Sequence, residues 1–112
     1  MPWPVELRLD RSRSLLTVAF DNGECFGLTA EYLRVESPSA EVKGHGPGQK
    51  IIVTGKEQVK IANLEPVGNY AVRIVFDDGH DTGLYSWDYL LELGREQAMR
   101  WQNYLKMKRA KK

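Results

Sequence analysis

The stretch YAVRIVFDDGHDTGLYSWDYL, residues 70–90, contains the strongest strand signal of the chain, followed directly by a helix start. Four alternating residues share one face of the predicted strand: Tyr70, Val72, Ile74 and Phe76. Residues 77–80 predict a turn in which Gly79 supplies a positive φ and the aspartates accept hydrogen bonds from nearby amides. Ser86 is expected to cap a helix, because its hydroxyl can accept a hydrogen bond from an amide of the first helical turn. The stretch therefore predicts the order strand, turn, helix.

The N-terminal third of the chain predicts a set of strands followed by a short helix. Alternating apolar and polar residues indicate three strands: Val5–Leu9, Leu15–Phe20 and Glu24–Leu28. Asn22-Gly23 joins the last two as a hairpin turn, because both residues tolerate positive φ. Thr29 is expected to cap a short helix over Ala30–Arg34.

The middle of the chain is less regular. Glycines and prolines predict an irregular segment over residues 36–50, and Ile51–Val53 predicts a short edge strand. Val59–Leu64 alternates and predicts a strand that Pro66–Asn69 should end. Gly94 is expected to end or bend the helix after Ser86, and a second helical run follows.

The order of these elements predicts an α+β fold. We expect a small, mainly antiparallel β-sheet domain with a short helix after the third strand and C-terminal helices. Residues 1–94 form the domain, and residues 95–112 form a C-terminal helix and basic tail that pack on it or extend from it. The length of 112 residues suits one domain.

The charge distribution is uneven. Residues 106–112 hold five of the 16 basic residues and no acid, so the remainder has 11 basic and 15 acidic residues, a net charge of −4. An acidic body is a poor match to a nucleic-acid-binding face, so we expect no nucleic-acid partner except through this tail. The tail itself is expected to be a frayed, solubilising terminus.

The composition indicates a cytoplasmic protein without a membrane span. No apolar run approaches the roughly 18 residues that a spanning helix needs. The first residues lack the pattern of a secretion signal, and the one cysteine, Cys25, excludes an intramolecular disulfide. Cys25 falls in a predicted strand, where it is expected to be a small buried apolar residue.

The residues offer little for metal or nucleophilic chemistry. Cys25, His45 and His80 match no zinc signature, and no Cys-x-x-Cys pair occurs. An iron site with two histidines would need His45, which lies between glycines that hold no fixed geometry. Asp77, Asp78 and Asp81 do not fit the spacing of a calcium loop. The aspartates are better interpreted as turn residues, and no cofactor is expected.

Four motifs together resemble a known family, the gamma-butyrobetaine-hydroxylase-like N-terminal domain. They are Leu33-Arg34, Ser37–Val42, Gly68–Ala71 and Phe76–Leu90, and the resemblance covers roughly residues 3–94. In the hydroxylases this domain precedes a separate iron- and 2-oxoglutarate-dependent catalytic domain. That catalytic domain is absent from this sequence, so the resemblance implies no hydroxylase activity here.

The resemblance also implies a degenerate zinc site. The hydroxylase domain binds zinc through three cysteines and one histidine. The histidine matches His80, while the cysteine positions correspond to Ser37, Ser39 and Val42. Neutral serine and valine are not effective zinc ligands, so the resemblance implies a form that keeps the frame and the histidine without the thiolates.

We expect an uncharacterised, non-catalytic accessory or adaptor domain that acts through protein–protein interaction. Similar domains are fused to iron–sulfur carrier ATPases of the Mrp type, which implies a partner of that kind and a link to iron–sulfur protein maturation. The residues expected to bind the partner are Arg34, His80, Tyr85 and Trp87, since Trp, Tyr and Arg often anchor interfaces. The alternative is a protein that binds zinc or iron through His80, with further ligands from a partner chain.

Overall fold

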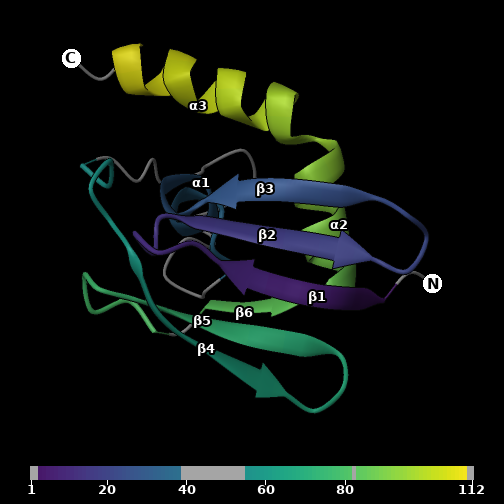
Figure 1. The fold of residues 1–112 in the computed structure, drawn as a ribbon. Coiled ribbons are helices and arrows are strands. Elements are labelled where there is room, and N and C mark those ends of the chain that lie inside the picture. The colour runs from purple at the N-terminus through teal and green to yellow at the C-terminus, as the bar shows by residue number, and fades with distance from the viewer. Residues whose placement is uncertain (1–2, 39–54, 82, 111–112) are drawn as a thin grey trace.

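The first sheet is built from the N-terminal strands. The computed structural model describes residues 3–38, 55–81 and 83–110. Strands β1 (Pro4–Leu9), β2 (Leu15–Phe20) and β3 (Cys25–Thr29) form an antiparallel sheet in that order (Figure 1). Gly23 has a φ of 93° in the turn between β2 and β3, which confirms the predicted hairpin.

The second sheet contains a strand that the sequence did not predict. Its order is β4 (Ile61–Val67), β5 (Ala71–Phe76) and β6 (Gly83–Ser86), with antiparallel pairs throughout. Residues 83–86 thus add a strand between the turn and the helix. The prediction that β4 ends before Pro66 is also wrong. β4 is an edge strand, where a proline without an N–H is tolerated.

Three helices complete the predicted α+β fold. Helix α1 (Ala30–Val35) begins at Thr29, whose Oγ1 accepts a hydrogen bond from the Tyr32 N–H at 3.1 Å. Helix α2 (Trp87–Arg95) begins at Ser86, whose Oγ accepts one from the Tyr89 N–H, also at 3.1 Å. Both predicted caps are confirmed.

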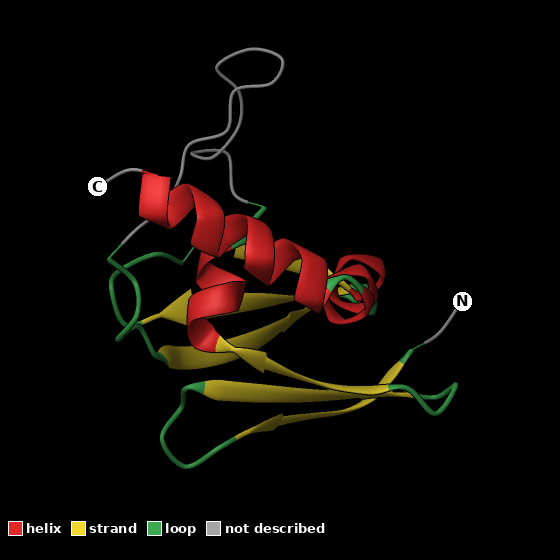
Figure 2. Ribbon diagram, turned by 90° about the horizontal axis from the view of Figure 1, so that it is seen from above, coloured by secondary structure: helices red, strands yellow, loops and turns green. Residues whose placement is uncertain are grey.

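Helix α3 (Gln97–Ala110) lies across the top of the fold (Figures 1 and 2). Its Trp101 ring packs against Tyr32 of α1, with the ring centroids 6.1 Å apart. Arg100 Nη1 lies 2.9 Å from a Glu36 carboxylate oxygen, and Lys108 Nζ lies 3.5 Å from a Glu31 carboxylate oxygen. The basic tail is therefore not frayed over its whole length, because α3 extends to Ala110 and Lys108, within the tail, forms an ion pair with Glu31.

Gly94 has a different role from the one predicted. It lies inside α2, which continues to Arg95. A Cβ at Gly94 would lie 2.4 Å from two atoms of the Phe26 ring, closer than any real contact. The glycine is thus required by the close packing of α2 on β3, and α2 ends one residue after it, at Arg95.

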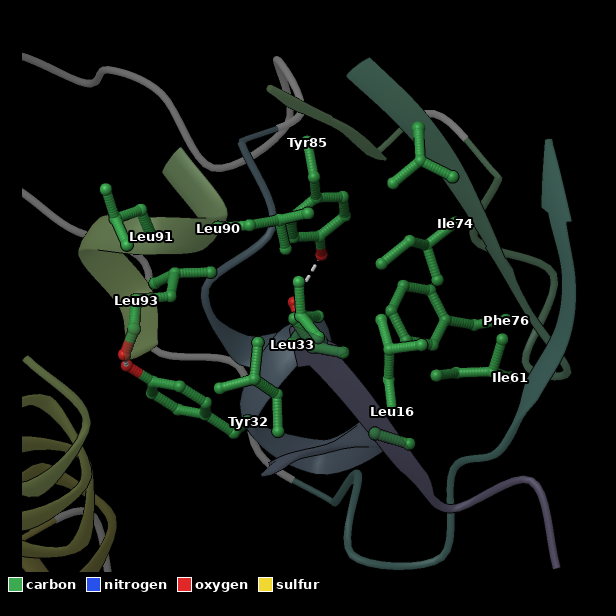
Figure 3. Packing of buried hydrophobic residues seen from close by; sticks show 14 of the residues in the cluster. Leu16, Tyr32, Leu33, Ile61, Ile74, Phe76, Tyr85, Leu90, Leu91 and Leu93 are labelled. Atoms are coloured by element: carbon green, nitrogen blue, oxygen red, sulfur yellow. Dashed lines mark hydrogen bonds between the residues drawn. The ribbon is translucent and has the colours of Figure 1, made fainter. Parts of the chain in front are cut away.

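The hydrophobic core lies between the two sheets and the helices α1 and α2. Figure 3 shows its side chains converging from these elements. Its fully buried members include Leu16, Val18, Leu28, Leu33, Ile61, Ile74, Leu90 and Leu93. Tyr70, which was predicted to share this face, is 54% exposed, because β5 begins only at the next residue.

The prediction that Cys25 is buried is wrong. Cys25 is exposed, because it pairs with Ala19 on the outer face of the first sheet. The predicted strand Ile51–Val53 and most of the irregular segment 36–50 lie outside the described residues. None of the helices in the described ranges is long and apolar enough to span a membrane.

Candidate functional site

The turn between β5 and β6 holds the predicted site histidine. Gly79 has a φ of 91°, in the left-handed region that favours glycine. Asp78 Oδ1 accepts a hydrogen bond from the His80 backbone N–H at 3.0 Å. Asp77 Oδ1 accepts one from the Lys60 backbone N–H at the same distance. These contacts confirm the predicted turn, in which aspartates bind nearby amides.

An ion pair joins this turn to helix α1. Asp78 Oδ2 lies 2.9 Å from Arg34 Nε and 2.7 Å from Lys56 Nζ. The Arg34 side chain is only 9% exposed and that of Asp78 18%. Burial by itself would raise the pKa of the Asp78 carboxyl. The hydrogen bonds from Lys56, the His80 amide and Arg34 outweigh burial and hold this pKa well below its usual range.

Ser37 and His80 form a second link between the same two segments. Ser37 Oγ and His80 Nε2 lie 2.9 Å apart, at hydrogen-bond distance, and either atom can be the donor. Ser37 is 2% exposed and His80 is 7% exposed. A serine bonded to a histidine is the arrangement of a nucleophile and its base. A substrate, however, cannot reach side chains buried to this extent, so the geometry favours a structural role for the pair.

Two tyrosines of the Phe76–Leu90 motif form hydrogen bonds with the end of α1. The Tyr85 hydroxyl donates a hydrogen bond to the Leu33 carbonyl oxygen, and burial raises the pKa of this phenol. The Tyr89 hydroxyl donates one to the Glu36 carbonyl oxygen at 2.5 Å. Burial, with a smaller effect of the Glu36 carboxylate, raises the pKa of Tyr89 to about 12. Both phenols are therefore neutral donors near neutral pH.

The four residues predicted to bind a partner differ in their surroundings. Arg34, His80 and Tyr85 come together around the turn, and all three are buried. Tyr85 faces the core because the unpredicted strand β6 places it on that side. Trp87 lies apart from them at the start of α2, half-buried, with its indole N–H donated to the Asn69 carbonyl oxygen at 2.8 Å. Partner binding by these residues stays a prediction.

Two exposed apolar side chains in this region, Tyr70 and Leu84, were not predicted as site residues. Tyr70 is 54% exposed, and its carbonyl oxygen accepts a hydrogen bond from the Trp87 backbone N–H at 3.0 Å. Leu84 is 40% exposed and lies opposite Arg73 on the outer face of the second sheet. Leu84 and Tyr85 are adjacent, so in a strand they face opposite sides, and this was the available signal that one of them is exposed. We call Tyr70 and Trp87, which the backbone hydrogen bond joins, the aromatic patch.

The zinc ion that the hydroxylase domain binds does not fit the residues present here. Ligand atoms lie about 2.0–2.3 Å from a tetrahedral zinc ion, so two of them are about 3.3 Å apart or more. Ser37 Oγ and His80 Nε2 are closer, at 2.9 Å. A Cβ at Gly83 would lie 2.9 Å from Ser37 Oγ, so the neighbouring space is filled. Ser39 and Val42 lie outside the described residues, which contain no group of three or more His, Cys, Asp or Glu side chains suited to a metal.

A shallow cavity lies away from this turn. Its volume is about 410 Å³, and its lining comes from the end of β3 and the first half of α3: Thr29, Gln97, Ala98, Trp101 and Gln102. None of these side chains titrates near neutral pH. The cavity is not lined by any of the residues predicted to bind a partner, Arg34, His80, Tyr85 and Trp87. It therefore gives no support to a reaction at the β5–β6 turn.

Comparisons with known proteins place the chain among relatives of similar fold. The model of the family described as gamma-butyrobetaine hydroxylase-like, N-terminal, matches residues 7–91. A protein solved by NMR in solution is 53% identical, with a TM-score of 0.83, and the match covers 98% of this chain and 82% of that one. A second NMR structure is 42% identical, with a TM-score of 0.81 and coverage of 96% and 84%.

A crystal structure is also similar. It is that of a protein with unknown function from Acidithiobacillus ferrooxidans ATCC 23270, which belongs to the DUF971 family. It is 41% identical to this chain, with a TM-score of 0.68, and the match covers 81% of this chain and 91% of the other. None of the curated proteins compared with this chain matches it significantly.

Proposed function

Because this chain belongs to the gamma-butyrobetaine hydroxylase-like N-terminal family, we propose that it is a non-catalytic accessory domain that acts by binding another protein. The observation that carries the proposal is the aromatic patch at the start of α2. Its Tyr70 side chain is 54% exposed, and Leu84, on the adjoining strand β6, is 40% exposed. Aromatic side chains at the surface often anchor interactions between proteins.

Trp87 is suited to anchor such a surface. Its indole N–H is already bonded to Asn69, and its backbone N–H to Tyr70. The ring is therefore held in place before a partner arrives, which lowers the entropy cost of binding. Its remaining exposed surface is apolar, so we expect the partner to contribute apolar or aromatic side chains there.

The buried motif supports a non-catalytic role. Ser37 and His80 use their reactive atoms on each other, and Asp78 is occupied by Arg34 and Lys56. These contacts hold the turn in place beneath the surface. The alternative, a metal bound by His80 with ligands from a partner chain, is disfavoured because a partner would have to reach a side chain that is 7% exposed.

The partner class to test first is an iron–sulfur carrier ATPase of the Mrp type, because similar domains are fused to such ATPases. Binding is measured by affinity purification at native expression, and directly between the purified chain and the ATPase of the same organism. Tyr70→Ser removes one exposed ring of the patch. Met99→Ser is the matched control, since Met99 is 55% exposed on α3, outside the patch.

We expect the wild-type chain and Met99→Ser to bind the same partner, with at least a tenfold weaker affinity for Tyr70→Ser. Circular dichroism checks that both variants are folded. A monomer with no reproducible partner would overturn the adaptor role. A partner that binds Tyr70→Ser as tightly as wild type would instead exclude the aromatic patch as its surface.

A further inference from the structure

We infer that a direct hydrogen bond between Ser37 and His80 replaces the link that the zinc ion provides in the hydroxylase domain, so that this chain folds and stays folded without metal. The two residues lie 43 positions apart in the sequence, and their side-chain atoms are 2.9 Å apart in the fold. A metal ion bound at this point would join the same two segments, the end of α1 and the β5–β6 turn. The hydrogen bond joins them without it.

The distance decides between the two kinds of link. Two ligands of one tetrahedral zinc ion are about 3.3 Å apart or more, and a hydrogen bond between a nitrogen and an oxygen atom is about 2.7–3.2 Å long. The separation of Ser37 Oγ and His80 Nε2 falls in the second range. His80 Nε2 is therefore already occupied by the serine hydroxyl.

The surrounding contacts make the metal unnecessary. The Arg34–Asp78 ion pair links the same helix to the same turn at 2.9 Å. The hydroxyl of Tyr85 binds the Leu33 carbonyl oxygen from β6. These links act beside the Ser37–His80 hydrogen bond, so no single cross-link has to supply the whole stability of the junction.

Replacing a thiolate zinc site with a hydrogen bond changes how the fold responds to chelators and oxidants. Zinc bound through thiolates is lost to chelators and to oxidants that attack the sulfur atoms. A serine hydroxyl and an imidazole are insensitive to both. This chain therefore keeps its fold, and with it the aromatic patch, under conditions in which a thiolate zinc site would come apart. The inference does not depend on the identity of the partner.

The first experiment uses the wild-type chain without a histidine tag. It is dialysed against EDTA, then exposed to one equivalent of zinc chloride and desalted, and bound zinc is measured by elemental analysis. We expect less than about a tenth of an equivalent of zinc, because structural sites bind zinc tightly. We also expect the same Tm with EDTA and with zinc, within about 1 °C. Stoichiometric zinc, or a Tm lowered by EDTA, would overturn the inference even if no variant could be purified.

The second experiment measures the coupling between the two side chains. Ser37→Ala, His80→Gln and the double variant are unfolded thermally, each with EDTA and with zinc. Losing one buried hydrogen bond is expected to lower Tm by about 4–8 °C in either single variant. The double variant should lose clearly less than the sum of the two, because both substitutions remove the same bond.

A matched control keeps this test specific. Ser12 is exposed on the β1–β2 turn, and its hydroxyl hydrogen-bonds with its near neighbours Asp10 and Ser14. Ser37→Ala combined with Ser12→Ala should therefore show additive losses. Additive losses for Ser37 and His80 as well, or losses that appear only when zinc is present, would show that the hydrogen bond is not the link.

Discussion

The ion pair between Arg34 and Asp78 offers the sharpest test of how the motif is held. Asp78→Asn removes the charge and keeps an oxygen that can still accept the His80 N–H. Breaking a fully buried ion pair costs about 3–5 kcal/mol. The Asp78 side chain is 18% exposed, so we scale this to a loss of about 2–4 kcal/mol in the free energy of unfolding. For a domain of this size, that lowers Tm by about 8–16 °C.

A second carboxylate–arginine pair provides the matched control. Glu65 and Arg73 form an ion pair between β4 and β5, with side chains 40% and 41% exposed. Exposed pairs contribute about 0–1 kcal/mol, so Glu65→Gln should lower Tm by a few degrees at most. Both variants are unfolded by urea and by heat, followed by tryptophan fluorescence and circular dichroism. Equal losses in the two variants would refute the reasoning that burial makes the Asp78 pair strong.

The same pair predicts a pH dependence with a definite sign. The pKa of Asp78 is lower in the folded state than in the unfolded state, where it is about 3.9. Its stabilising contribution is therefore complete above the unfolded pKa and is lost as the pH falls through the folded pKa. The difference in Tm between wild type and Asp78→Asn should be constant from pH 7 to 5 and should shrink below pH 4. A difference that stays constant down to pH 2.5 would contradict this linkage.

Three further substitutions test how the helices are held. Gly94→Ala should lower the free energy of unfolding by about 1–3 kcal/mol, although alanine favours helix, because its Cβ would lie 2.4 Å from the Phe26 ring. Adding Phe26→Leu should recover part of this loss, and a Gly94→Ala variant as stable to urea as wild type would contradict the prediction. Arg100→Met should cost about 1.5–3 kcal/mol, because Glu36, 6% exposed, loses a charged donor; an unchanged urea midpoint would exclude this role for the arginine. Thr29→Ala should lower the free energy of unfolding by about 1 kcal/mol, because it removes the cap of α1, whereas Thr29→Ser should keep most of the stability of wild type. Equal stability of the Thr29→Ala and Thr29→Ser variants would show that the cap contributes nothing.

The local elements were largely predictable because their signals are local. Ser86 and Thr29 cap helices as expected, and the turn at Gly79 forms as expected, since each depends on the chemistry of a few adjacent residues. The short strand Gly83–Ser86 was missed, because four residues between a turn and a helix cap are too few to show an alternation. The packing role of Gly94 was missed because the residue that requires a glycine there is Phe26, which lies 68 positions earlier in the sequence.

The candidate site shows the same division. The sequence and its family resemblance were enough to name His80 and Ser37 and to predict the loss of the thiolates. Only the tertiary structure shows the two side chains in contact and Lys56 beside Asp78. Only the tertiary structure buries Arg34 and Tyr85 while it leaves Tyr70 exposed.

By itself, the sequence determined the class of fold, the helix caps, the family and the residue types at the degenerate zinc site. These properties depend on short-range periodicity, on single side chains at helix ends and on motifs read in order. The tertiary structure decided which motif residues are buried, what Ser37 and His80 bind, and which apolar side chains remain at the surface. Those outcomes depend on contacts between segments tens of residues apart, and one sheet register sets many of them at once.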